Sequence, residues 1–483
     1  MKRFALILVM KRFALFLVMM AVVLASCTDY DSFTSDPSAR LTFSTDTVKM
    51  DTIFSNTGSA TYTFWVFNHG DDGIRIGSVR LKNGNQTGFR VNVDGTYLDN
   101  SLGSVATDFE VRRGDSIRVF VELTPAETRQ DAPQMVADQL VFQLESGAQQ
   151  QVQLQAWAWD ALKVKDLVVS CDTVIASTVP VVFYGDGVRV DSGAVLTLRN
   201  TTLYFHDKAG IDVYGSLVTE GVVLRGDRLD HMFDYLPYDR VSGQWRGLWF
   251  AETSVRNTLT DTEIRNAGNA IVLSDSCALD TLSQRLTMTR CTIHNAKGYG
   301  VLSFNSNVGL YYCQLTNTLG DCLAIYGGKC DVDHCTLAQF YPFSADRGAA
   351  LRFSDGDKRF HPKPVAYPLL VLSCRNSILT GYEKDVFFGE RDAFVDEAGK
   401  PLSEEQRQAR GIVFSYRFEN CLMRTPAIED DTLSFKHIQW ETPEDSIQGK
   451  QHFRTIDEKN LYYDFHLDSL STAQGKGCYV EQP

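Results

Sequence analysis

Apolar and polar residues alternate over much of the N-terminal third of the chain. The alternation is clearest at residues 61–67 and 116–122, where Tyr, Phe, Val or Ile occupies every second position. A period of two residues is that of a β-strand with one buried face. Turn-forming Asn, Asp and Gly separate such stretches, for example at residues 68–73 and 113–115. Short strands spaced about ten residues apart predict a β-sandwich over residues 40–161.

A different pattern begins near residue 262, where one short motif recurs. The copies are Asp-Thr-Glu-Ile at 261–264, Arg-Cys-Thr-Ile at 290–293, Tyr-Cys-Gln-Leu at 312–315 and His-Cys-Thr-Leu at 334–337. Successive copies are 29, 22 and 22 residues apart. This period, with β-forming residues and Gly or Asn in the links, is typical of a solenoid of stacked β-coils. We therefore predict an all-β chain in which a parallel β-helix occupies residues 165–483, with loop excursions and a C-terminal cap.

Equivalent positions in stacked coils lie above one another, about 4.8 Å apart. One column should be an inward stack of reduced thiols, formed by Cys291, Cys313 and Cys335. A second column should be an asparagine ladder at the turns, formed by Asn266, Asn295 and Asn317. Parallel neighbours point their side chains the same way, so we expect few disulfides. If one disulfide forms as an exception, we expect it to join Cys322 and Cys330.

Three excursions interrupt the coils, at residues 227–243, 341–367 and 384–411. The last contains a polar stretch from Ser403 to Ala409 that predicts a short helix with Ser403 as its cap.

The N-terminus reads as an export signal. Lys11 and Arg12 precede an apolar run of thirteen residues, which is too short to span a bilayer, since spanning takes about 20 residues. The run ends in Leu-Ala-Ser-Cys, which matches the lipobox of bacterial lipoproteins, so we predict a signal peptide over residues 1–26 and acylation of Cys27. An uncleaved short anchor is the alternative. Residues 27–39 should form a flexible tether.

Two further features concern this end of the chain. The first residues, Met-Lys-Arg-Phe-Ala-Leu, recur from Met10, so either the segment is duplicated or translation starts at Met10, which we favour. Asp29 and Asp31 follow Cys27 directly, an arrangement similar to the surface-export signal of Bacteroidota lipoproteins. We expect an outer-membrane protein that is lipid-anchored and surface-exposed, with retention facing the periplasm as the alternative.

Composition narrows the classes of partner. The signal peptide contains four basic and no acidic residues, so the mature chain has 43 basic against 60 acidic residues, a net charge of −17. Binding to nucleic acid needs clustered Lys and Arg, and we expect none.

Four segments carry a resemblance to a known family. They are Asp-Thr-Ile-Phe at 51–54, Phe-Arg-Val-Asn-Val-Asp-Gly at 89–95, Asp-Ser-Ile-Arg-Val-Phe-Val-Glu at 115–122 and Ala-Trp-Ala-Trp-Asp-Ala at 156–161. They resemble the N-terminal immunoglobulin-like domain of Bacteroidota surface lipoproteins, in which a right-handed parallel β-helix follows. The resemblance covers nearly the whole chain, implies this architecture and carries no known reaction.

The strongest candidate for a catalytic cluster is Asp331, Asp333 and His334, with Lys329 close by in sequence. The two aspartates are two residues apart, so both side chains should leave the same face of a strand. They could serve as an acid/base pair on a polysaccharide, or simply form a solvated strand face, which we favour. Asp355 and Asp357 resemble part of a calcium loop, but the remaining ligands are missing, so we interpret them as a turn and expect no metal and no cofactor.

Aromatic residues on the coils could stack on sugar rings or fill the core, and we favour core filling. They are Trp245, Trp249, Tyr299, Phe304, Tyr311, Tyr312, Tyr326 and Phe340. The sequence thus favours a non-catalytic binding or structural protein of the cell surface that contacts glycans or other surface proteins. The alternative is a polysaccharide lyase or glycoside hydrolase that uses a groove of the β-helix.

Overall fold

A computed structural model describes residues 32–233, 235–275, 283–363 and 365–479. Cys27 and the predicted signal peptide lie outside the described residues. The chain divides into two compact units, one of Met1–Glu127 with Gln134–Ala158 and one of Thr128–Pro133 with Trp159–Pro483. In the described part of the chain, no helix has the length and apolar character that crossing a membrane requires.

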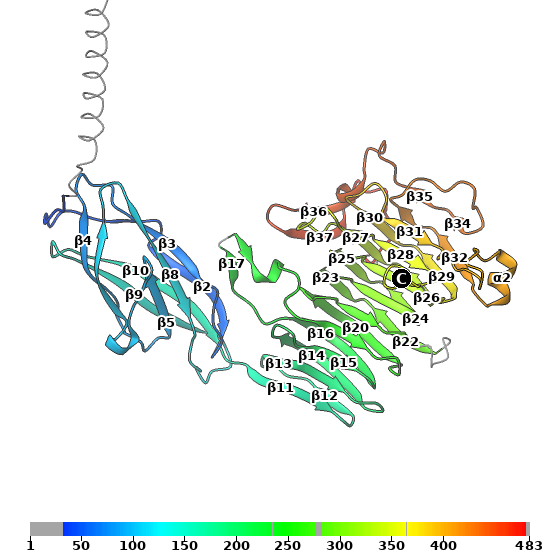
Figure 1. Cartoon of the computed structure of the whole chain (residues 1–483), viewed down its shortest axis with the longest axis horizontal. Coiled ribbons are helices and arrows are strands. Elements are labelled where there is room, and N and C mark those ends of the chain that lie inside the picture. Colours follow the sequence, from blue (N-terminus) through cyan, green and yellow to red (C-terminus); the bar gives the residue numbers. More distant parts are fainter. Residues whose placement is uncertain (1–31, 234, 276–282, 364, 480–483) are drawn as a thin grey trace, which may run out of the picture. The chain divides into compact units, whose positions relative to one another are not determined.

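The first unit is a β-sandwich of two five-stranded sheets (Figure 1). One sheet has the order β1 (Thr42–Phe43), β3 (Tyr62–Phe67), β8 (Ser116–Leu123), β5 (Phe89–Val93) and β6 (Thr96–Tyr97). The other has the order β2 (Thr47–Phe54), β10 (Gln149–Trp159), β9 (Gln134–Leu144), β4 (Ile74–Leu81) and β7 (Val105–Val111). A short turn, η1 (Asn100–Leu102), precedes β7. The alternating residues of β3 and β8 point into the core as predicted.

The predicted tether is shorter than expected. Thr34 donates its amide to the carbonyl of Gly73 at 2.9 Å, and Gly73 donates to Ser32 at 2.7 Å. The guanidinium of Arg75 lies 4.3 Å from the centre of the Phe33 ring. These contacts hold residues 32–34 against the sandwich, because their backbone groups bond to Gly73, next to the first residue of β4.

The second unit is a parallel β-helix, and this prediction is confirmed. Its strands stack in chain order from β11 to β35, and each pairs mainly with a strand about one coil away (Figure 1). The long strands bend through corners and contribute to two faces. They are β11 (Leu162–Val169), β13 (Val181–Val190), β14 (Val195–Phe205), β16 (Ser216–Gly226), β20 (Asn257–Arg265), β24 (Val301–Tyr311) and β26 (Leu323–Asp333). The first rung starts at Leu162, which pairs with Val181, three residues before the predicted boundary.

The coils have three faces, here named sheets A, B and C. Besides halves of the long strands, sheet A contains β15 (Gly210–Val213), β19 (Gly247–Phe250), β21 (Ile271–Leu273), β28 (Leu351–Ser354) and β31 (Phe387–Glu390). Sheet B contains β12 (Thr173–Ile175), β22 (Gln284–Thr289), β29 (Leu369–Arg375), β32 (Phe414–Glu419) and β34 (Phe435–Lys436). Sheet C contains β23 (Thr292–Ala296), β25 (Gln314–Thr318), β27 (Thr336–Gln339), β30 (Ile378–Gly381), β33 (Leu422–Met423) and β35 (Gln439–Trp440).

The corner from sheet B to sheet C has the same backbone in every coil after the first. One residue with positive φ is followed by one that enters sheet C. The positive-φ residues are Asn200 (47°), Gly221 (64°), Asp261 (46°), Arg290 (52°), Tyr312 (57°), His334 (51°), Asn376 (50°), Asn420 (53°) and His437 (53°). A left-handed residue turns the chain sharply within a single position. Most of these residues are not glycine, so the stacked corners hold a conformation that their side chains disfavour.

The predicted thiol column follows this corner and is confirmed. Cys291, Cys313 and Cys335 are buried, and Cys313 donates its amide to the sulfur of Cys335 at 3.4 Å. Ser377 occupies the next position, where its hydroxyl accepts the amide of Cys335 at 3.1 Å. The nine cysteines of the described chain are all free, including Cys322.

The asparagine ladder lies at the corner from sheet C to sheet A. Asn266, Asn295 and Asn317 have φ of 60°, 62° and 56°. The Asn295 amide donates to Asn266 Oδ1 at 2.8 Å, and Asn266 donates to the carbonyl of Asp239 at 2.9 Å. The ladder is confirmed, although its side chains bond one another as well as the backbone.

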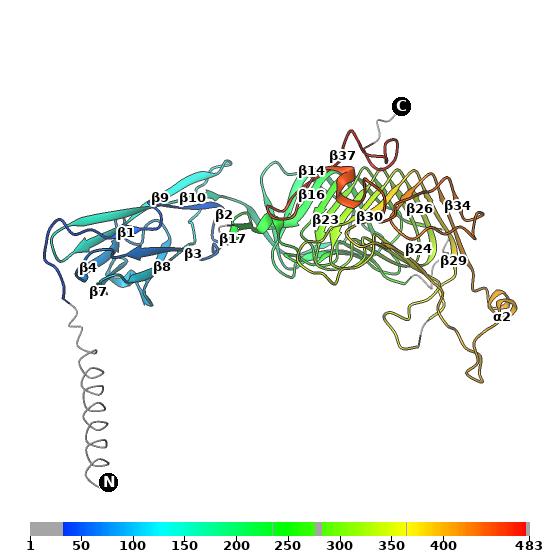
Figure 2. The ribbon, with the colours of Figure 1, turned by 90° about the horizontal axis from the view of Figure 1, so that it is seen from above.

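Excursions and the C-terminal segment cover parts of the coils. One excursion holds the hairpin of β17 (His231–Phe233) and β18 (Leu236–Pro237) and the turn η2 (Tyr238–Arg240). Another extends away from the rungs and carries α2 (Glu404–Ala409), with the predicted Ser403 cap (Figure 2). After η3 (Gly449–His452), the hairpin of β36 (Phe453–Asp457) and β37 (Tyr462–Leu467) packs Phe453 and Phe465 against Phe340.

Candidate functional site

The predicted carboxylate pair lies on the outer surface of sheet B. Asp331 and Asp333 are on β26, and both point away from the core, as expected. Arg375 on the neighbouring rung approaches both carboxylates at 3.3 Å. Tyr311, on the rung before, donates its hydroxyl to Asp331 Oδ2 at 3.1 Å. Burial raises the pKa of Tyr311, and the charge of Asp331 adds to that effect.

Of the other two residues in this cluster, His334 contacts the carboxylate pair directly. His334 is the left-handed corner residue, and its ring stacks on Tyr312 with centroids 4.9 Å apart. Its Nδ1 lies 2.9 Å from Asp333 Oδ1. Lys329 is on the same strand, in register with Asn307 and Val371. The two carboxylates are therefore part of an ion-pair cluster on the outer surface of sheet B, in which each forms an ion pair with Arg375.

Asp355 and Asp357, which we interpreted from the sequence as a turn, directly follow the end of β28. Both are buried, and their oxygens accept bonds from protein donors. Asp355 accepts the amide of Asp392 at 2.8 Å and forms an ion pair with Arg407. Asp357 accepts the amide of Val365 at 2.7 Å. These bonds tie the excursion after β28 to the one after β31, which is a structural role that isolated sequence motifs do not reveal.

Among the described residues, no group of three or more His, Cys, Asp or Glu is arranged to hold a metal ion. Burial raises the pKa of the nearby Asp392, and the charges of Asp355 and Asp357 raise it further, although the amide of Lys358 lowers it.

The aromatic residues singled out in the sequence divide into two groups. Trp245, Tyr326 and Phe340 are buried, Trp245 in the main core of the coils and the other two in separate, smaller apolar clusters. The others are only partly buried and lie on outer faces of the coils: Trp249, Tyr299, Phe304, Tyr311 and Tyr312.

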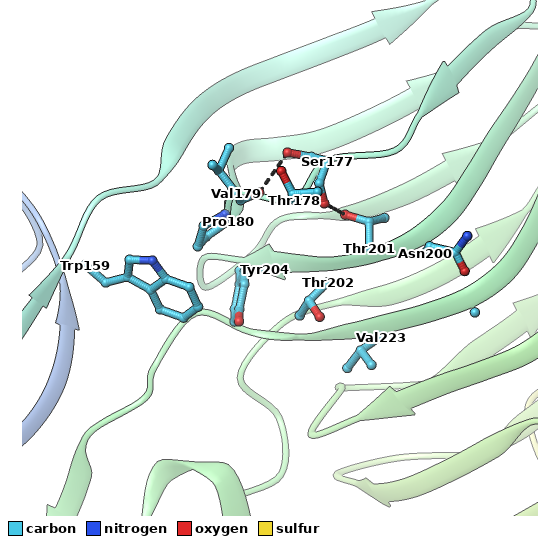
Figure 3. A pocket seen from close by; sticks show the side chains of 11 residues that line it. Trp159, Ser177, Thr178, Val179, Pro180, Asn200, Thr201, Thr202, Tyr204 and Val223 are labelled. Carbon is cyan, nitrogen blue, oxygen red and sulfur yellow. Dashed lines mark hydrogen bonds between the residues drawn. The ribbon is translucent and has the colours of Figure 1, made fainter. Parts of the chain in front are cut away.

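A shallow pocket of about 370 Å³ lies on the outer face of sheet C in the first coils (Figure 3). Its residues are Trp159, Ser177, Thr178, Val179, Pro180, Asn200, Thr201, Thr202, Tyr204, Gly221 and Val223. Trp159 and Tyr204 lie next to each other at one end, and Thr202 and Val223 continue along the floor (Figure 3). This set contains no carboxylate, His, Lys or Arg.

The pocket is held open by the fold of the coils. Thr202 and Val223 are register partners on β14 and β16, and both point outward. Gly221 keeps the neighbouring corner clear, because a Cβ there would lie 2.7 Å from the Oδ1 atom of Asn200. The opposite wall is the turn of residues 177–180, where Thr201 donates its hydroxyl to the carbonyl of Ser177 at 3.0 Å.

The polar groups of the pocket are suited to hydrogen bonding rather than proton transfer. Burial raises the pKa of Tyr204, against the opposing charges of Arg225 and Arg265, so the phenol stays neutral. Trp159 donates its indole N–H to the carbonyl of Asp131 at 3.0 Å, which orients the ring. Within the described residues, the hydroxyls of Thr178 and Thr202 have no hydrogen-bond partner. The pocket thus offers aromatic rings beside hydroxyl groups, which suits a ligand with both apolar and hydroxyl-bearing faces.

Sequence reasoning missed this pocket. Trp159 and Tyr204 are 45 residues apart, and nothing in the sequence links them. The strand pattern did contain one signal, because Thr202 and Tyr204 alternate with the inward Leu203 and Phe205 and must therefore face outward.

Of the comparisons with known proteins, the match to a family model supports the coils. The model of the family described as right handed beta helix region matches residues 170–337. No curated protein matches the sequence. Among solved structures, a protein of unknown function from Porphyromonas gingivalis W83 is 12% identical, over 27% of this chain and 50% of its own, with a TM-score of 0.19. This chain therefore spans half of that relative.

Two other solved structures illustrate the range of similarity. The N-terminal domain of PorA is 16% identical, over 25% of this chain and 97% of its own, with a TM-score of 0.19. The catalytic domain of a GH87 alpha-1,3-glucanase in complex with nigerose is 8% identical, over 80% of this chain and 89% of its own, with a TM-score of 0.23.

Proposed function

We propose that this protein is a lipid-anchored protein of the outer membrane, displayed on the surface of a Bacteroidota-type cell, whose β-helix binds glycan without cleaving it. The lipobox ending at Cys27 and the acidic residues behind it support the anchor and the surface display. The sandwich, which we take to be immunoglobulin-like from its sequence resemblance, then serves as the stalk.

The observation that carries the binding role is the composition of the pocket on sheet C. Trp159 and Tyr204 provide ring faces, and Thr178 and Thr202 provide hydroxyls that the described protein leaves unpaired. A sugar ring has apolar C–H faces and a hydroxyl rim, so it meets both kinds of group at once. The absence of ionisable acid or base partners along the pocket favours binding over hydrolysis, because a hydrolase needs two carboxylates flanking the bond.

The alternative enzyme would have to use Asp331 and Asp333. Both carboxylates are paired with Arg375, and neither lines the pocket. We therefore place the non-catalytic role first.

A glycan-array screen of the soluble fragment starting at Thr28 tests this proposal, followed by titration calorimetry with the best ligand. Thr202→Arg should fill the pocket and weaken binding at least tenfold. Thr197→Arg is the matched control, because Thr197 is on the same strand but faces outward from sheet B. Equal binding by both variants, or released sugar in a product assay, would contradict the proposal.

The anchor is tested separately. Cys27→Ser should block acylation, so the full chain should remain unprocessed and leave the membrane fraction. Protease shaving of intact cells then distinguishes surface display from retention facing the periplasm. Unchanged mobility and fractionation of the Cys27→Ser protein would refute the lipid anchor.

A further inference from the structure

Sheet A ends one rung earlier than sheets B and C at the C-terminal end of the solenoid. Its last strand, β31, pairs with β28. In sheets B and C the ladder continues to β34 and β35. The next coil starts along β31, where Val386 donates its amide to the carbonyl of Arg424 at 3.0 Å, and then residues 425–434 form no strand. In the described chain, no strand pairs with the outer edge of β31.

Among the described strands, the outer edge of β31 has no partner, although the amide of Phe387 on that edge donates to Asp385 Oδ1 at 3.2 Å. Leu351 donates its amide to the carbonyl of Val386 at 3.2 Å, which sets the phase of the parallel ladder. Alternate residues of a strand bond to opposite neighbours, so Phe388 and Glu390 face β28 and Gly389 faces outward. Gly389 is exposed, and its edge is therefore accessible to an incoming strand.

A hollow of about 380 Å³ lies beside this edge, on the inner side of the coil. Sheet A contributes the rings of Phe353 and Phe387, and sheet B contributes those of Phe414 and Tyr416. Phe353 and Phe414 stack with centroids 5.5 Å apart, so the walls are packed in place. An inward side chain of one more rung in sheet A would enter this space, since inward positions lie above one another in every earlier coil.

The rim of the hollow is mainly acidic, although the guanidinium of Arg391 lies 5.8 Å from the centre of the Phe414 ring. Asp385 lines it, and Glu429 and Asp430 are exposed on the segment that forms its far wall. Asp431 accepts the hydroxyl of Tyr416 at 3.3 Å and the amide of Ser434 at 3.0 Å, which holds that segment in place. Negative charge at the rim attracts a positively charged ligand and disfavours an acidic one.

We propose that β31 and the hollow form a docking site for an extended, basic segment of a partner protein, which adds as the missing rung of sheet A. Backbone hydrogen bonds to the edge provide affinity, and an apolar side chain in the hollow provides specificity. Lys or Arg next to that side chain meets Glu429 and Asp430. The site is separate from the pocket on sheet C and does not depend on glycan binding.

Random heptapeptides displayed on phage, selected against the immobilised full chain in detergent, test the proposal. The selected peptides should carry an apolar residue flanked by Lys or Arg in an alternating pattern. Ala427→Trp, which places a ring at the exposed wall of the hollow, should reduce their retention at least tenfold. Glu429→Lys should reduce it severalfold. Matched controls are Ala398→Trp and Glu397→Lys, exposed positions in a different excursion.

The outcomes are separable. Peptides that bind Ala427→Trp as well as the parent chain, or the absence of any enriched peptide, would overturn the proposal. Self-association of the full chain that disappears in Ala427→Trp would assign the edge to a second copy of this chain and would also overturn it. Loss of glycan binding in Thr202→Arg with peptide retention intact would leave the docking site standing, whatever its effect on the proposed function.

Discussion

The sandwich and the β-helix are both built of β-strands, but they hold their strands in place by different means. In the sandwich, ten strands close over one core, and side-chain packing between two sheets sets the arrangement. In the β-helix, the backbone repeats one left-handed corner between sheets B and C in every coil after the first, and buried columns of like residues follow from it. The first design depends on particular side chains, whereas the second depends on conformations that recur along the axis.

The largest expected effect tests whether the two cores are independent. The two hydrophobic clusters share no residue. Phe142→Ala should therefore destabilise the sandwich by about 3–5 kcal/mol and leave amide exchange in the β-helix unchanged. Phe205→Ala is the reciprocal variant, because Phe205 is equally buried and stacks on Trp245 in the other core. Hydrogen exchange that changes in both units for either variant would contradict the separation.

The next prediction concerns the dependence of the coils on backbone conformation. Asn295 has a φ of 62°, and its amide is bonded to Asn266. Asn295→Leu should lower the unfolding free energy of the β-helix by about 2–4 kcal/mol, because it removes a buried hydrogen bond and also strains the backbone at a positive φ. Asn295→Gly also removes the side-chain amide, but glycine adopts this positive φ without strain, so the loss of unfolding free energy should be smaller. Chemical denaturation monitored by near-ultraviolet circular dichroism gives both values, and equal losses would show that strain is unimportant.

A third prediction uses pH to separate the C-terminal segment from the coils. Burial, together with a smaller effect of the charge of Arg265, lowers the pKa of His294 to about 4. The ring contacts Tyr463 and Phe465 of the C-terminal hairpin. The pKa of His294 is lower in the folded protein than in the unfolded chain, where it is near 6.5. The contribution of His294 to stability is therefore complete above pH 6.5 and is lost as the pH falls toward 4. The loss should be about 1–2 kcal/mol, since the ring is partly exposed.

The measurement for this prediction is amide exchange of β36 and β37 at pH 7, 5.5 and 4. Exchange should rise as pH falls, after correction for the intrinsic rate. His294→Gln should flatten this dependence, and a dependence that persists unchanged in the variant would assign it to other groups.

The smallest effect is expected where the thiol column changes to a hydroxyl. Ser377→Cys extends the column by one member and replaces the hydroxyl that accepts the amide of Cys335. Unfolding free energy should change by less than about 1 kcal/mol, because a buried thiol suits this position and loses one hydrogen bond. Ser377→Leu overfills the same position and is the control, with an expected loss of about 1–3 kcal/mol. Thermal melts of both proteins check the order.

The sequence predicted the coils well where a residue type repeats. Cys291 and Cys313 mark equivalent positions because a small apolar side chain fits under the corner in each coil. The corner itself was harder to recognise, because its left-handed residue is Asp, Arg, Tyr, His or Asn in turn. Position in the stack determines that conformation, and the intrinsic preference of Arg290 or Tyr312 does not.

The candidate site was less predictable than the fold. Asp331 and Asp333 were correctly placed on one strand face, because alternation fixes which way their side chains point. Their pairing with Arg375 depends on a rung 42 residues or more further along the chain, and no local pattern indicates it. The pocket at Tyr204 combines residues from several coils, so only the stacked structure brings them together.

The constant corner between sheets B and C has a consequence for how this chain can vary in length. Every excursion in the described coils leaves from one of the two borders of sheet A, and the B–C corner keeps the same two-residue form from Asn200 to Cys421. The length of that corner is fixed, whereas at the borders of sheet A segments of any length can be inserted without shifting the rungs. Grafted loops should therefore be tolerated at the borders of sheet A, whereas a single residue added at the corner between sheets B and C should displace every coil beyond it.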